Sequence, residues 1–155
     1  MRILIADDDR TSRVLLARIL RNEPDCSVVE AMNGEDAWAC LNEAKLPDLC
    51  IFDIRMPAMS GLELLQKMRA DKHLQAIPVI LCTAVSDRNV IVQAAALAVK
   101  YYIVKPYTEA LVLTQVRNVK ETLLQAQIQS EKSKPVAPSV EAVPAAEAAP
   151  AVVEQ

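Results

Sequence analysis

The sequence predicts an α/β fold in which helices cover both faces of a parallel sheet. Short apolar runs of strand length alternate five times with segments in which apolar residues recur at helical spacing, and the connections are short. This alternation is typical of parallel sheets with right-handed crossovers. The apolar run Leu49–Phe52 also has the continuous hydrophobicity of a strand that is buried on both faces.

Capping, turn and breaker residues mark the element boundaries in the first half of the chain. Thr11 or Asp9 can cap the first helix, and Pro24 confirms that this helix has ended. The pair Asn33-Gly34 predicts the turn into the second helix.

The same kinds of signal delimit the elements of the second half. Ser86 or Asp87 starts the fourth helix, which is expected to reach about Val99. Pro106 stops the fifth strand, and Thr108 caps the last helix. We therefore expect strands at 2–6, 27–31, 48–53, 78–83 and 101–105, and helices at 12–21, 35–43, 62–70, about 87–99 and 108 to about 130.

The last helix and the C-terminal segment differ in character. A heptad-like apolar seam runs along the helix, and for its first turns we interpret it as the face that packs on the core. The seam consists of Val112, Val116, Val119, Leu123 and Ala126. From Lys134 onward the chain is mostly Ala, Pro, Val and Glu, a composition that favours disorder. We expect a domain over residues 1–130 and a disordered Ala/Pro-rich tail over 131–155.

Composition and charge argue against several functional classes. A net charge of -3 argues against direct binding of nucleic acid by this chain. The apolar run 90–99 is too short to span a membrane, and Met1-Arg2 leads directly into a strand without a signal peptide. The cysteines show no CxxC pair, which favours a reduced, cytoplasmic protein. They are Cys26, Cys40, Cys50 and Cys82.

Several strands end in side chains that can carry chemistry. Asp7 and Asp8 follow the first strand, Asp53 ends the third, Thr83 ends the fourth and Lys105 ends the fifth. Parallel strands place their carboxyl ends at one edge, where open α/β sheets bind ligands, so we expect these side chains to cluster.

Such a cluster suits phosphoryl transfer. Crowded carboxylates repel one another, and a hard divalent cation relieves this repulsion; oxygen ligands without His or Cys indicate Mg²⁺. Lys105 adds a second positive charge and Thr83 a hydroxyl donor. Because phosphoryl transfer depends mainly on positioning and charge neutralisation, we interpret Asp53 as a nucleophile that forms an aspartyl phosphate.

The sequence also resembles the receiver domain of two-component response regulators. The blocks that carry this resemblance occur in the family's order, and the match covers about residues 1–130. They are RILIADDD, FDIRMPAMSGLELL, PVILCTA and YYIVKPY. The resemblance implies a flavodoxin-like (βα)5 fold with strand order 2-1-3-4-5.

The resemblance further implies a role for each residue at the strand ends. Asp53 would accept a phosphoryl group from a histidine kinase or phosphotransfer protein, and the domain would catalyse only its own phosphorylation and dephosphorylation. Asp7, Asp8 and Asp53, with the backbone carbonyl of Arg55, would hold Mg²⁺.

The resemblance also assigns roles to Lys105 and to the two switch residues, Thr83 and Tyr102. Lys105 and Thr83 would contact the phosphoryl group, and Tyr102 would turn inward as Thr83 moves. The Lys105–Pro106 peptide bond is often cis in the family. One departure is the pair Ala98-Val99, which stands where the family usually has Gly-Ala before the fifth strand.

The fourth helix suggests where a partner docks. Over residues 90–99 only Gln93 is polar, whereas a helix on the surface normally has a polar outer face. We expect this helix, the fifth strand and the last helix to form a surface for a downstream protein target or a homodimer. No output domain follows in the sequence, which favours a stand-alone regulator or a phosphorelay shuttle.

Rival interpretations come from other classes. The spacing Asp7-x-Asp9-x-Thr11 also fits haloacid-dehalogenase-like phosphatases, which would use Asp7 as nucleophile, but Asp53 is then unexplained. A receiver-like module that binds without being phosphorylated is a second rival. An FMN carrier of the same fold is disfavoured because acids after the first strand would repel the FMN phosphate.

Overall fold

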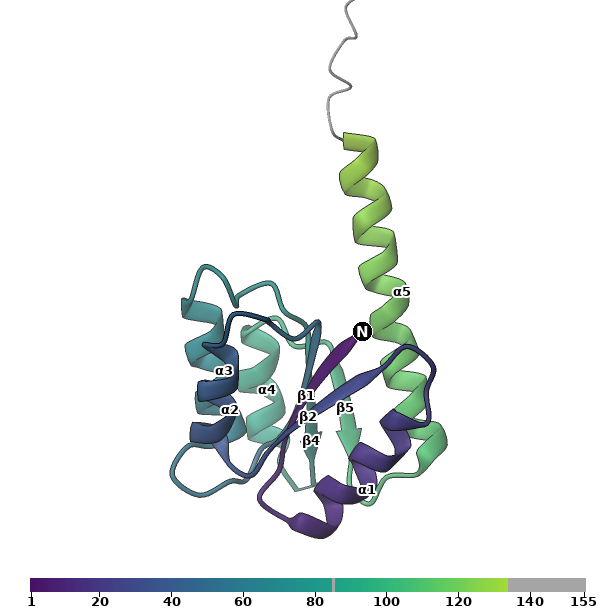
Figure 1. The fold of residues 1–155 in the computed structure, drawn as a ribbon. Helices are drawn as coiled ribbons and strands as arrows, with labels where there is room; N and C mark the ends of the chain where they lie inside the picture. Colours follow the sequence, from purple (N-terminus) through teal and green to yellow (C-terminus); the bar gives the residue numbers. More distant parts are fainter. Residues whose placement is uncertain (85, 134–155) are drawn as a thin grey trace, which may run out of the picture. The chain divides into compact units, whose positions relative to one another are not determined.

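One five-stranded parallel sheet forms the centre of the fold, in a computed structural model that describes residues 1–84 and 86–133. The strand order is β2-β1-β3-β4-β5, which confirms the predicted flavodoxin-like arrangement (Figure 1). The strands are β1 (Arg2–Ala6), β2 (Ser27–Ala31), β3 (Leu49–Asp53), β4 (Val79–Thr83) and β5 (Tyr101–Val104). The helices are α1 (Arg10–Arg21), α2 (Gly34–Leu41), α3 (Gly61–Ala70), α4 (Arg88–Ala96) and α5 (Glu109–Ser133).

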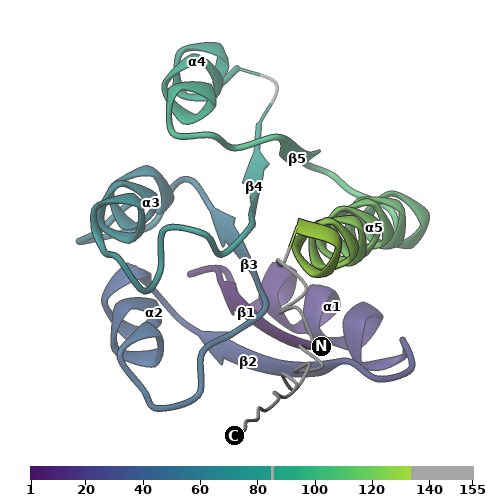
Figure 2. The same ribbon diagram turned by 90° about the horizontal axis from the view of Figure 1, so that it is seen from above.

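Helices cover both faces of this sheet. Figure 2 shows α2, α3 and α4 on one face, and α1 with the first turns of α5 on the other. The central strand β3 is buried along Leu49–Phe52, as expected for a strand with helices on both faces. On the face covered by α5, Val112, Val116 and Val119 are each at most 1% exposed, so the first part of the apolar seam does pack on the core.

The chain divides into two compact units, residues 1–120 and 121–155. The first contains the whole sheet and every strand end considered below. Within the described residues, the second consists of residues 121–133 of α5, so this helix continues past the expected end near 130. The disordered tail expected over 131–155 lies almost entirely outside the described residues. No described helix is long and apolar enough to cross a membrane.

Several helix boundaries differ by one to three residues from those expected, and two of these differences have a clear local cause. Asp9, rather than Thr11, caps α1: its side chain accepts a hydrogen bond from the backbone N–H of Thr11, so the helix begins at Arg10. The fourth helix ends at Ala96 and does not reach Val99, because Ala98 adopts a left-handed conformation with φ of 64°. Val99 is instead a buried residue between α4 and β5.

The start of α3 fixes the loop that follows β3. Ser60 and Glu63 form a reciprocal capping box. The backbone N–H of Gly61 donates to the carbonyl of Ile54 at 2.9 Å, and a Cβ on residue 61 would collide with the Asp53 carbonyl oxygen. A glycine is therefore required where the helix turns back against the end of β3.

Candidate functional site

Three carboxylates meet at the carboxyl edge of the sheet. β1 and β3 are neighbours with Ala6 paired to Phe52, so the residues that follow, Asp7 and Asp53, come out side by side. Ligand oxygens of Asp7, Asp8 and Asp53 all lie within 4.8 Å of one another. Asp7 is only 2% exposed, whereas Asp8 is exposed, so the cluster opens to solvent on one side.

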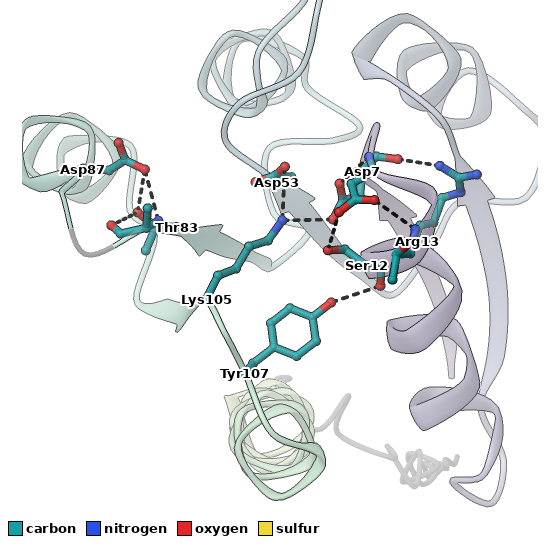
Figure 3. Close-up of polar contacts among 11 residues, drawn as sticks. Asp7, Ser12, Arg13, Asp53, Thr83, Asp87, Lys105 and Tyr107 are labelled. Atoms are coloured by element: carbon teal, nitrogen blue, oxygen red, sulfur yellow. Dashed lines mark hydrogen bonds and ion pairs between the residues drawn. The ribbon is translucent and has the colours of Figure 1, made fainter.

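Lys105 joins this cluster from the end of β5. Its ammonium lies 3.2 Å from Oδ2 of Asp7 and 3.3 Å from Oδ2 of Asp53 (Figure 3). Burial opposes the charge of the ammonium, but Asp53 and Asp7 outweigh this effect and hold the pKa of Lys105 above its ordinary value. The cis Lys105–Pro106 peptide bond lies directly after the strand.

The surroundings of Asp53 disfavour the charged form of its carboxyl group. Burial of its carboxyl group, with smaller contributions from Asp7 and Asp8, raises the pKa of Asp53 to about 6, and Lys105 offsets this increase only in part. A carboxylate whose negative charge is poorly compensated favours the arrival of a cation.

The cluster fits a hard divalent cation. The three side chains offer only carboxylate oxygens, the ligands that Mg²⁺ prefers, and one ammonium cannot neutralise all of them. One oxygen of Asp7 is already oriented by the backbone N–H of Asp9 at 2.9 Å. Arg13 donates to the Asp7 backbone carbonyl at 2.8 Å and fixes the turn after β1.

Thr83 lies at the same edge, but its hydroxyl points elsewhere. The hydroxyl oxygen is 3.0 Å from the backbone carbonyl of Ala84 and 3.3 Å from Oδ2 of Asp87. Figure 3 shows this pair apart from the group formed by Lys105, Asp53 and Asp7. The sequence therefore brings Thr83 to the site but does not predict the partner that holds its hydroxyl.

Asp87 is the residue of this site that the sequence failed to assign. It precedes α4 but its side chain makes no capping hydrogen bond to that helix. Instead it accepts from the Arg55 guanidinium at 2.6 Å, and this contact lowers the pKa of Asp87. The one available signal was an acid four residues after a strand-end threonine, which is also what an ordinary helix start looks like.

Tyr102 is half-buried against α4. Its phenol oxygen lies 3.3 Å from the Val99 carbonyl and 3.4 Å from the Ile91 carbonyl. The predicted switch aromatic therefore contacts both α4 and the turn between α4 and β5. A second tyrosine, Tyr107, donates to the Ser12 carbonyl at 3.0 Å and links the end of β5 to α1 (Figure 3).

Comparison with known families agrees with this geometry. Residues 3–117 match the response regulator receiver domain, which is more than half of the chain. The chain therefore belongs to the family of response regulator receiver domains, which are signalling modules of two-component systems rather than enzymes of the usual kind.

Within this family the chain is similar to chemotaxis regulators. It is 35% identical over 121 residues to the chemotaxis protein CheY of Pseudomonas aeruginosa, covering 78% of this chain and 97% of that relative. It is 37% identical over 123 residues to CheY-3 of Vibrio cholerae, covering 79% of this chain and 94% of the relative.

Solved structures give the same result. A putative response regulator from Chloroflexus aurantiacus superposes with a TM-score of 0.70 at 27% identity and covers 76% of this chain and 95% of its own. A receiver protein from Pseudomonas putida superposes with a TM-score of 0.69 at 28% identity, with the same coverage. Membership of this family does not support the phosphatase interpretation.

Proposed function

We propose that Asp53 is the phosphoryl acceptor of this receiver domain. The observation that carries the proposal is its position: a half-buried carboxylate at the end of the central strand, 3.3 Å from the Lys105 ammonium and within an acidic cluster. Asp7 is a poorer acceptor because it is almost fully buried and its two oxygens already contact Asp9 N–H and Lys105.

Asp7, Asp8 and Asp53 would hold Mg²⁺ together with the backbone carbonyl of Arg55. When bound, the ion supplies positive charge that neutralises the oxygens of the incoming phosphoryl group. The open, exposed side of the cluster at Asp8 leaves access for the ion and the donor.

The transfer uses groups that this chain already positions. An oxygen of Asp53 attacks phosphorus, a new O–P bond forms, and the P–N bond to the donor histidine breaks while the imidazole nitrogen recovers a proton. Lys105 stays between the acceptor and Asp7 and compensates the charge added to Asp53. Hydrolysis then returns the carboxylate, as water attacks phosphorus and inorganic phosphate leaves.

The signal would leave the site through Thr83 and Tyr102. The Thr83 hydroxyl moves to the phosphoryl group, and Tyr102 follows because it packs against the segment that Thr83 leads into. The affected surface is formed by α4, β5 and the part of α5 in the first unit. Val92 on α4 is 70% exposed and Val104 on β5 is 39% exposed, so apolar side chains are available there for a partner.

The upstream partner we propose is a histidine kinase or a phosphotransfer protein, and the downstream partner a protein target or a second copy of this chain. The relatives are named chemotaxis proteins, which supports signalling through protein contacts. A cytoplasmic location accords with such partners.

Intact-mass measurement tests the proposal directly. The protein is incubated with Mg²⁺ and acetyl phosphate, and a mass increase of one phosphoryl group that hydroxylamine removes is expected. The increase should disappear with Asp53→Asn and with a chelator in place of Mg²⁺. The matched control is Asp36→Asn, an exposed acid in the first turn of α2, which should take up phosphate like wild type. Phosphate uptake that persists in Asp53→Asn would overturn the assignment.

A further inference from the structure

Asp87 is a buried carboxylate that phosphoryl transfer to Asp53 does not itself require. It is 7% exposed and accepts hydrogen bonds from the Arg55 guanidinium at 2.6 Å and the Ala84 backbone N–H at 3.1 Å. The Thr83 hydroxyl lies 3.3 Å away. The two carboxylate oxygens of Asp87 have different partners: Oδ1 faces Arg55, and Oδ2 faces Thr83 and Ala84.

The contact with Asp87 bears on when Thr83 can act. A threonine hydroxyl has one proton to donate, and here its acceptors are the Ala84 carbonyl and the Asp87 carboxylate. To contact a phosphoryl group on Asp53, the hydroxyl must leave both. A charged acceptor holds a donor more strongly than a neutral one, so Asp87 makes that departure more costly.

Arg55 holds Asp87 in turn. The side chain of Arg55 is 73% exposed, whereas that of Asp87 is 6% exposed, so the guanidinium reaches inward from the surface to a buried charge. Without it, the carboxylate would retain only neutral donors, which is unfavourable for a buried ion. The pair joins the loop after β3 to the start of α4, two segments that line a common cavity of about 600 Å³.

These contacts favour the unphosphorylated conformation. A phosphoryl group on Asp53 would offer the Thr83 hydroxyl a second charged acceptor. The hydroxyl that Asp87 holds is therefore the group for which a phosphoryl group competes.

We propose that Asp87 is a positioning residue: it holds the Thr83 hydroxyl away from Asp53 until a phosphoryl group displaces it, with Arg55 keeping the carboxylate in place. The inference rests on the proposed function and adds a residue that controls how readily the switch engages. The direction of the expected effect follows from the geometry: removing Asp87 frees the Thr83 hydroxyl, so affinity for a phosphoryl group should increase.

The test measures affinity for a phosphoryl mimic in a double-mutant cycle. Binding of beryllofluoride at saturating Mg²⁺ is measured by calorimetry for wild type, Asp87→Ala and Asp87→Asn, each with Thr83 intact and with Thr83→Ala. With Thr83 intact, Asp87→Ala should tighten binding about three- to tenfold, since one hydrogen bond to a charged group no longer competes. Asp87→Asn keeps an oxygen acceptor and should give a smaller increase. In the Thr83→Ala background neither change should alter the affinity.

The cycle separates positioning from a purely structural role. A substitution that merely disturbs α4 would shift the affinity equally in both backgrounds, and that result would overturn the inference. Unchanged affinity in Asp87→Ala with Thr83 intact would overturn it too, while leaving the proposed function standing. Failure of the wild type to bind beryllofluoride would reject the proposed function and the inference together. Arg21→Gln, which breaks the ion pair with Glu30 on the opposite side of the sheet, is the matched control and should bind like wild type.

Discussion

The ammonium of Lys105 lies 3.3 Å from Oδ2 of Asp53 and so connects the ends of β5 and β3, two strands that are separated in the sheet by β4. The same ammonium is 3.2 Å from Asp7. One cation therefore compensates two carboxylates in the structure, and a metal ion that binds there must share them with it.

Because the ammonium and the ion share these carboxylates, removing the ammonium should strengthen Mg²⁺ binding but slow phosphorylation. Lys105→Met should tighten Mg²⁺ binding about three- to tenfold, because a competing positive charge beside the carboxylates is lost. The same change should slow phosphorylation by acetyl phosphate at least about tenfold, because the charge on the transferred group loses a compensating cation. Metal titration and phosphate uptake by mass measure the two effects. Lys67→Met, whose ammonium lies 4.9 Å from the centre of the Trp38 ring, is the control; equal effects of both variants would contradict the role of Lys105.

The raised pKa of Asp53 predicts how stability without metal depends on pH. The pKa is about 6 in the folded protein against 3.8 for the unperturbed group, so the folded state binds more protons than the unfolded chain between these values. Stability therefore falls as pH rises from about 4 to 6. Asp53→Asn has no such titration, so its free energy of unfolding at pH 7 should exceed that of wild type by about 1 kcal/mol, after allowance for solvent screening.

Denaturant unfolding at pH 4 and pH 7, with a chelator and with Mg²⁺, provides the measurement. The advantage of Asp53→Asn should be present at pH 7 in chelator and much smaller at pH 4. Saturating Mg²⁺ should stabilise wild type more than the variant, because the ion binds the folded carboxylates and the variant lacks one of the three. A pH-independent difference between the two proteins would contradict the raised pKa.

The left-handed Ala98 predicts a stabilising substitution. A residue with a Cβ pays roughly 1 kcal/mol for φ near 60°, and glycine does not. Ala98→Gly should therefore raise the free energy of unfolding by about 0.5 to 1 kcal/mol. Ala95→Gly, within α4, should lower it by a similar amount because glycine is unfavourable inside a helix. Thermal or denaturant unfolding of both variants tests the contrast; destabilisation by Ala98→Gly would show that the turn needs its methyl group.

The apolar exterior of α4 predicts an effect on association. Ala95 is exposed on this helix, and only Ala94 among its residues is buried. A charge introduced by Ala95→Glu should abolish association that depends on phosphorylation, while phosphate uptake stays unchanged. Sedimentation of the protein with and without beryllofluoride measures self-association, and a target protein is assayed in the same way. Association that survives the substitution would exclude this surface.

The strand ends could be predicted because apolar runs and chain direction suffice to place them. A parallel sheet brings together residues as far apart in sequence as Asp7 and Lys105 without any further information. Asp87 could not be found in this way. Its partner Arg55 is 32 residues away, and the contact depends on how two loops pack, which no periodic pattern encodes.

The end of α4 was missed for a related reason. The sequence has no glycine at the turn, and the apolar residues continue to Val99, so the local pattern favours a longer helix. Tertiary contacts decide otherwise: Arg69 on α3 donates to the Leu97 carbonyl at 2.9 Å, and Val99 is buried. Contacts of this kind override local propensity.

The most direct test of the account is to locate the phosphate after reaction with acetyl phosphate and Mg²⁺. Peptide mass spectrometry distinguishes the segment that contains Asp53 from the segment that contains Asp7. The account predicts one phosphoryl group on Asp53, lost on treatment with hydroxylamine, and none on Asp7. Phosphate on Asp7 would contradict it and indicate a hydrolase. No phosphate on the folded wild-type protein would leave a receiver that binds its partners without being phosphorylated.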